Sequence, residues 1–119
     1  MHSLVETPDR DGAFPRLTEE QIALLRQGGR TRRTGRGDVL IREGQRERDF
    51  IVVLAGKVAT YEGYGTEDQR PVRVHGPGRF LDEIGLLTGQ PAFVSSVVEE
   101  PGELLEVPVP ALEIGRAFV

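Results

Sequence analysis

The chain of 119 residues has the composition of an ordinary folded protein, with 38% hydrophobic and 29% charged residues. Its formal net charge of −4 argues against general affinity for nucleic acids or anionic membranes, because both select positively charged surfaces. The absence of cysteine excludes disulfides, thiol nucleophiles and cysteine-ligated metals. No apolar run reaches the roughly 18 residues of a membrane span, and the N-terminus lacks the apolar core of a signal peptide. We therefore expect a cytoplasmic protein.

The length predicts a single domain, because the chain is too short for two hydrophobic cores. Residues 1–14 are polar and rich in turn-forming residues, which predicts a flexible N-terminal arm. The folded domain is expected over residues 15–119.

The stretch LTEEQIALLRQGG predicts a helix at the start of this domain. Thr18 and Gln21 have the spacing of a capping box, and Gly28 and Gly29 mark the end of the helix. Near the other end of the chain, Pro110 is expected to open a short final helix, where its missing N–H costs nothing. The apolar face of the first helix is expected to consist of Ile22, Leu24 and Leu25.

Between the helices the pattern changes to short apolar runs separated by glycine and proline, which predicts about seven strands in a small antiparallel jelly roll. A tight reversal is expected at Ala55 and Gly56, because glycine adopts a positive φ without steric cost. A second turn is expected over Glu100, Pro101 and Gly102. The main expected strands cover residues 38–44, 50–54, 57–61, 71–75, 92–99 and 103–109.

Three stretches, GDVLIREG, DFIVVLAGKV and GRFLDEIGLLTGQP, together resemble the cyclic nucleotide-binding domain family over roughly residues 17–117. Gly37, Gly44 and Gly56 match the turn glycines of the family, and residues 80–91 match its phosphate-binding cassette. The resemblance implies a mainly β fold, a cyclic nucleotide-binding-like double-stranded β-helix (jelly roll) with short N- and C-terminal helices. It also implies a regulatory role.

A narrower resemblance covers the stretch HGPGRFLDEIGLLTGQPAFVSSVVEEPGELLEVPV. This stretch is similar to the N-terminal module of bacterial thioredoxin reductase-like flavoproteins. The chain has neither the Gly-x-Gly-x-x-Gly motif nor the Cys-x-x-Cys motif of the flavoprotein itself, so it corresponds to the isolated module. The expected partner is therefore a separate protein or a fused flavin-dependent reductase-like domain.

In the family, a short helix points its N-terminal amides at the cyclic phosphate, as helix N-termini do with anions in general. A glutamate there binds the ribose 2′-hydroxyl, and the resemblance assigns that position to Glu83. It also assigns the inward-pointing amides to Ile84 and Gly85. Asp82 replaces the glycine that lets the phosphate approach, and it carries a charge of the same sign as the phosphate.

The strand after the cassette also departs from the family pattern. Ala92 stands at the position of the family arginine that neutralises the phosphate, and Phe93 stands at the Ser/Thr position. Losing one partner of a buried charge pair costs about 2–5 kcal/mol, or roughly thirty- to several-thousand-fold in affinity. We therefore interpret the cassette as degenerate and not as a cyclic nucleotide site. Its apolar residues are expected to be core residues: Ile84, Leu86, Leu87 and Phe93.

The alternative function is a sensor that still binds a nucleotide or another small anion. A sensor requires an open, polar pocket at Glu83, whereas a scaffold has that pocket filled by Phe93 and its neighbours.

The stretch RQGGRTRRTGR forms a basic stripe that could dock an acidic partner or nucleic acid. No aromatic residues that could stack on bases are interleaved with the arginines, so we favour a solvated strand face with arginines offset by glutamates. The arginines are Arg26, Arg30, Arg32, Arg33 and Arg36.

No catalytic, metal or cofactor site is expected. His2 and His75 are the only histidines, and a metal enzyme would need several ligands converging on one site. His75 is interpreted as a strand-end or loop residue. Ser95 and Ser96 lie in an apolar strand with no base nearby in the sequence, so neither is a candidate nucleophile.

Overall fold

One helix and six strands form the part of the chain that the structure describes, residues 4–9, 15–81 and 88–110 of a computed structural model. All pairings among these strands are antiparallel. No helix in these residues is long and apolar enough to cross a membrane. The elements are α1 (Glu19–Arg26), β1 (Arg30–Arg33), β2 (Val39–Ile41), β3 (Phe50–Glu62), β4 (Arg70–His75), β5 (Phe80–Leu81) and β6 (Ser95–Val107).

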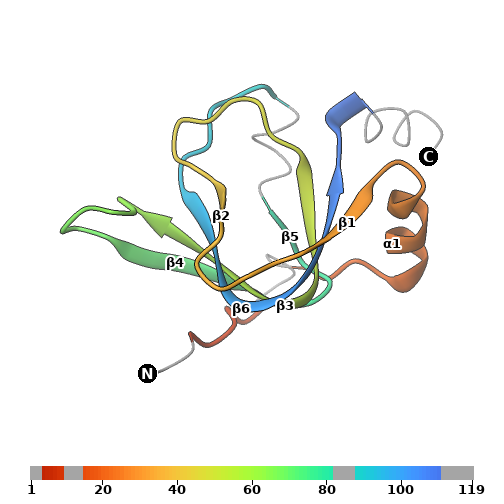
Figure 1. Cartoon of the computed structure of the whole chain (residues 1–119), viewed down its shortest axis with the longest axis horizontal. Helices are drawn as coiled ribbons and strands as arrows, with labels where there is room; N and C mark the ends of the chain where they lie inside the picture. Colours follow the sequence, from red (N-terminus) through yellow and green to blue (C-terminus); the bar gives the residue numbers. More distant parts are fainter. Residues whose placement is uncertain (1–3, 10–14, 82–87, 111–119) are drawn as a thin grey trace.

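Two long strands, β3 and β6, organise the sheet. They pair along their whole length, from Phe50 opposite Val107 to Tyr61 opposite Ser95. The first half of β3 also pairs with β5 and its second half with β4. In the same way, the first half of β6 pairs with β2 and its second half with β1. Figure 1 shows the β3–β6 pair curving through the molecule, so that its two halves carry different neighbours. The expected mainly β, antiparallel fold is confirmed.

The predicted reversal at Ala55 and Gly56 is wrong, because β3 continues through both residues as one strand of 13 residues. The predicted turn over residues 100–102 is wrong for the same reason, since β6 also continues through it. The register of the pair shifts repeatedly between Val53 and Val58. A β-bulge bends a strand without ending it, so glycine and proline at this place produce a bend and not a hairpin.

The bend requires a close approach of two backbones. Gly56 has the expected positive φ, +86°, and a Cβ there would lie 2.5 Å from the carbonyl oxygen of Glu100. A Cβ at Gly102 would in turn collide with the backbone carbonyl of Ala55. Thr34 fastens the same point, because its N–H donates to the carbonyl of Gly102 (3.0 Å) and its hydroxyl accepts from the N–H of Gly102 (3.0 Å).

The other two turn glycines also adopt the predicted conformation, with φ of +87° at Gly37 and +86° at Gly44. The N–H of Gly37 donates to the carbonyl of Val98 (2.8 Å), and the N–H of Gly44 donates to the carbonyl of Ala92 (2.7 Å). Both turns are thereby attached to the chain in and just before β6. β2, which lies between them, is shorter than the expected strand over residues 38–44.

The first half of β3 is buried on both faces. Val53 faces an interior cluster, whereas Phe50 and the other outer residues pack against Ile22 and Leu25 of α1. The capping box of this helix is confirmed, since Thr18 and Gln21 bond each other's backbone N–H groups. The interior cluster consists of Ile41, Ile51, Val53, Val58, Leu81, Ala92 and Leu104.

Leu24 was expected in the apolar face of α1, and this prediction is wrong, because Leu24 is 55% exposed. Ile22 and Leu25 are three residues apart and therefore share one face of the helix, whereas Leu24 is only two residues from Ile22 and points away.

Residues 4–9 of the expected flexible arm are attached to the sheet. The N–H of Thr7 donates to the carbonyl of Val74 in β4 (2.9 Å), and its Oγ1 accepts from the N–H of Val74 (2.8 Å). Residues 1–3 and 10–14 lie outside the described residues, and the boundary between arm and domain stays a prediction. The expected final helix begins at Val109 and Pro110, and its continuation also lies outside them.

We predict that Gly56→Ala destabilises the domain far more than Gly65→Ala. Both glycines have a φ of +86°, so each alanine carries a left-handed strain of roughly 1–2 kcal/mol. A Cβ at Gly65 meets nothing within 4 Å, whereas one at Gly56 meets the backbone of β6. This overpacking adds about 1–3 kcal/mol. Urea denaturation of both variants measures the difference, and equal losses would contradict the close approach at the bend.

Candidate functional site

The candidate site is the cassette between β5 and β6, and the structure describes its two flanks. Asp82, Glu83, Ile84 and Gly85 lie outside the described residues, as does the short helical turn expected there, together with Leu86 and Leu87. Their predicted roles stay predictions. The site is therefore built from β5, from residues 88–94 and from the β2–β3 loop that lies against them.

Ala92 occupies an inward position at the C-terminal flank. It is 5% exposed and belongs to the interior cluster. Its N–H donates to the carbonyl of Gln45 (2.9 Å) and its carbonyl accepts from the N–H of Gly44 (2.7 Å), so its backbone is held from both sides. The position assigned to the family arginine thus faces the interior, as a phosphate ligand must. The methyl group found there supplies neither a charge nor a hydrogen-bond donor.

Phe93 does not pack into the interior, so the prediction that it is a core residue and fills the pocket is wrong. Its side chain is 68% exposed. Ala92 takes the inward position, and the chain bends at Phe93 and Val94 before β6 begins. The apolar character of a residue in a bend does not by itself predict its burial, because single large apolar residues are common on protein surfaces.

Two arginines of the β2–β3 loop hold the C-terminal flank of the candidate site, and neither was predicted to have a role. Arg48 donates from Nη1 to the carbonyls of Gln45 (2.9 Å) and Gln90 (3.0 Å). Arg46 donates from Nη1 to the carbonyl of Gly89 (3.1 Å). These bonds join two loops through backbone oxygens. In the sequence these arginines stand in the charged stretch GQRERDF, which does not indicate their carbonyl partners.

The basic stripe is a solvated strand face, as expected. All four residues of β1 are exposed, and β1 pairs with the glutamate-bearing end of β6. Arg30 lies opposite Glu106 and Arg33 opposite Glu103. Arg32 forms an ion pair with Glu106, with Nε 3.2 Å from Oε1.

His75 is the last residue of β4, which confirms its expected place at a strand end, but it is buried, with 7% of its surface exposed. Burial, together with the neighbouring cations Arg79 and Arg73, lowers the pKa of His75 to about 4. The imidazole is therefore neutral at pH 7. Within the described residues, no group of three or more His, Asp or Glu side chains could hold a metal ion.

Ser95 and Ser96 are buried at the start of β6. The hydroxyl of Ser95 accepts a hydrogen bond from the N–H of Glu43 (3.0 Å), so it fastens the chain next to β2. This contact gives Ser95 a structural role.

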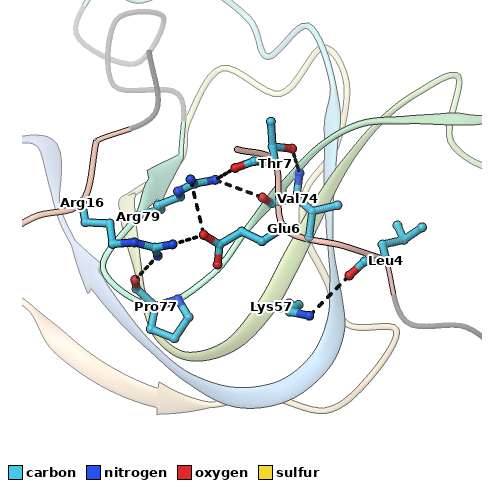
Figure 2. Close-up of polar contacts among 8 residues, drawn as sticks. All are labelled: Leu4, Glu6, Thr7, Arg16, Lys57, Val74, Pro77 and Arg79. Carbon is cyan, nitrogen blue, oxygen red and sulfur yellow. Dashed lines mark hydrogen bonds and ion pairs between the residues drawn. The ribbon is translucent and has the colours of Figure 1, made fainter. Parts of the chain in front are cut away.

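A buried arginine close to the N-terminal flank was also missed. Arg79 is 2% exposed and directly precedes β5. Its Nη1 donates to the carbonyls of Thr7 and Val74, and its Nη2 lies 3.3 Å from Oε1 of Glu6 (Figure 2). Arg16 binds the same carboxylate and donates to the carbonyl of Pro77 (2.6 Å). Nothing in the local sequence distinguishes Arg79 from an ordinary surface residue of a turn.

The geometry defines a class of protein, a mainly β, antiparallel jelly-roll module. Residues 31–114, more than half of the chain, match the cyclic nucleotide-binding domain model. The chain belongs to the cyclic nucleotide-binding domain family. No match to this sequence is found among curated proteins.

Solved structures share the fold. The Thermus thermophilus catabolite activator protein aligns with a TM-score of 0.70 and 23% identity, over 82% of this chain and 46% of that protein. A cyclic nucleotide-binding domain from Methylobacillus flagellatus aligns with a TM-score of 0.71 and 19% identity, over 87% and 58% of the two chains. The regulatory domain of Toxoplasma gondii PKA, solved with cAMP, aligns with a TM-score of 0.70 and 21% identity, over 82% of this chain and 37% of that chain. These likenesses establish the jelly-roll fold, and this chain spans less than two thirds of each of the three.

We predict that His75 makes the stability of the domain fall on acidification. The folded-state pKa of about 4 lies below the ordinary value of 6.5, so only the unfolded state takes up the proton between these values. The contribution is complete above pH 6.5 and is lost as the pH falls toward 4. Between pH 7 and pH 4.5 the loss is on the order of 2–3 kcal/mol.

The measurement compares urea denaturation of the parent with that of His75→Gln at both pH values. The glutamine variant should lack this part of the pH dependence. An equal slope in both proteins would contradict a buried, neutral His75.

Proposed function

We propose that this chain is a non-catalytic regulatory or scaffolding domain of the cytoplasm, with a degenerate phosphate-binding cassette, that acts through contact with another protein. The observation that supports this most directly is Ala92. It lies inward, at the position where the resemblance puts the phosphate-neutralising arginine, and its side chain is a buried methyl group.

The energetic consequence is a large loss of phosphate affinity. A buried charge pair that lacks one partner loses about 2–5 kcal/mol, or roughly thirty- to several-thousand-fold in affinity. Asp82 adds repulsion if it occupies the family's glycine position. A hydroxyl bond from Glu83 to a ribose contributes only about 1–2 kcal/mol net, which does not restore the loss.

A sensor of a nucleotide or another small anion is the second candidate, and the exposure of Phe93 favours it. A phenyl ring that is 68% exposed does not fill the interior, so this residue does not close the pocket. The Toxoplasma neighbour, of the same fold, was solved with cAMP.

The same exposed ring supports a protein partner. Exposed aromatic side chains are enriched where proteins bind one another, and Phe93 stands at the end of the cassette. The structural neighbours are longer chains in which this fold makes up only part of the protein. We propose a thioredoxin reductase-like flavoprotein as the partner, on the basis of the similarity over residues 78–108.

We predict that cyclic AMP or cyclic GMP at about 1 mM leaves the melting temperature of the parent unchanged. A ligand at roughly a hundred times its Kd stabilises the native state by about 2.7 kcal/mol. In a domain of this size about 1 kcal/mol moves the midpoint by roughly 4 °C or more, so a binder with a Kd of about 10 µM would give an obvious shift. A shift of several degrees in the parent would establish the sensor function instead.

The complementary variant combines Ala92→Arg with Asp82→Gly and should gain a nucleotide-dependent shift of several degrees. Phe93→Arg is the matched control, because it adds the same charge at an outward position and should gain none. A double variant that folds but shows no shift would contradict the assignment of the cassette positions.

We predict that the full chain binds the flavoprotein partner and that Phe93→Ser weakens this binding by at least about tenfold, as loss of an aromatic anchor does. Leu24→Ser is the control, since Leu24 is 55% exposed but lies on α1. Pull-down followed by detection of bound flavin measures the interaction. Recovery of only a DNA-binding or kinase partner would contradict the proposed partner.

A further inference from the structure

Arg79 places a buried positive charge directly before β5, the N-terminal flank of the candidate site. Its side chain is 3% exposed, and its backbone is bonded to the centre of β3, because the N–H of Val53 donates to its carbonyl (2.8 Å). β5 begins at the next residue, Phe80, and leads into residues 82–87. A buried guanidinium is tolerated only when a counter-charge and hydrogen-bond acceptors replace the lost water. The partners of Arg79 therefore stabilise the chain at the start of β5.

Besides the nearby carbonyl of Val74, the partners of Arg79 come from the N-terminal segment of the chain. Residues 4–9, which we call the strap, supply the carboxylate of Glu6 and the carbonyl of Thr7, the latter 72 residues away from Arg79. The carboxylate also lies against Gly76, where a Cβ would collide with it. Arg16 holds Glu6 from the other side and bonds the carbonyl of Pro77 (2.6 Å). Figure 2 shows Glu6 between the two guanidinium groups.

The strap has few other attachments. Thr7 exchanges two bonds with Val74, through its N–H (2.9 Å) and its Oγ1 (2.8 Å). The ammonium of Lys57 donates to the carbonyl of Leu4 (3.4 Å). Leu4 packs, partly buried, against a core cluster that includes Val74, whereas Val5 is 84% exposed. Polar contacts and this one leucine therefore hold the strap. Such a segment can leave the sheet without opening the core.

We propose that the strap is a regulatory device that sets the position of β5, the N-terminal flank of the candidate site, by neutralising Arg79. When the strap leaves, Arg79 loses the carboxylate of Glu6 and the carbonyl of Thr7. The buried cation then turns toward water and carries residues 76–79 and β5 with it. A protein that captures the N-terminal segment would thereby change the N-terminal flank of the candidate site. This inference rests on the proposed regulatory function. The coupling between the strap and β5 is expected whether or not the domain binds a nucleotide.

The test is amide hydrogen exchange of the full chain carrying Glu6→Gln, which removes the charge at nearly constant shape. Exchange should rise at least about tenfold in the strap and also at Phe80 and Leu81, the loss expected when a charge-assisted bond is removed. The amides of Val97 and Val98 in β6 should not change. Glu67→Gln removes the same charge from the exposed β3–β4 loop and serves as the control, with no expected rise.

Thr7→Val is a second variant, which loosens the strap by removing the acceptor of the Val74 bond while keeping Glu6. It should raise exchange in the strap and in β5 together, and it carries the test if Glu6→Gln does not fold. A rise confined to the strap in the folded variants would overturn the coupling. Unchanged exchange in the strap would show that the contacts of Glu6 and Thr7 do not hold it on the sheet, and it would overturn the proposal.

Discussion

The rest of the structure depends on the place where β3 and β6 bend together. Gly56 and Gly102 bring the two backbones to a separation that no side chain allows, and Thr34 fastens the same point. The bend divides each long strand into two halves with different neighbours. Without it, β3 and β6 would form a flat ribbon, and no interior would exist for a cassette to border. The strand pair is thus both the core of the fold and the support of the site.

The interior that this bend creates decides what the cassette can bind. Ala92 faces inward and is fixed by backbone bonds to Gly44 and Gln45, so a methyl group occupies the interior position to which the resemblance assigns the phosphate-neutralising arginine. Arg48 donates to backbone carbonyls of both loops of this flank, those of Gln45 and Gln90. These contacts favour a rigid flank over a phosphate ligand, which agrees with the proposed scaffolding role.

Two basic side chains are buried between the end of β4 and the start of β5, and the protein accommodates them in different ways. His75 is neutral at pH 7, because burial lowers its pKa to about 4. An arginine cannot lose its proton in this way, so Arg79 requires Glu6 as a counter-charge. This difference explains why the N-terminal segment is drawn onto the sheet at this point. A residue outside the β-roll thereby becomes part of its electrostatic balance.

The sequence by itself determined the features that depend on neighbouring residues. The capping box of Thr18 and Gln21 and the positive φ of Gly37, Gly44 and Gly56 follow from local backbone chemistry, and the family resemblance added the jelly roll. Only the tertiary structure decided whether Gly56 reverses a strand or bends it, because that depends on the strand paired opposite it. It also decided that Phe93 points outward and that Glu6 meets Arg79. Burial and ion pairing join residues far apart in the chain, and no local pattern records such partners.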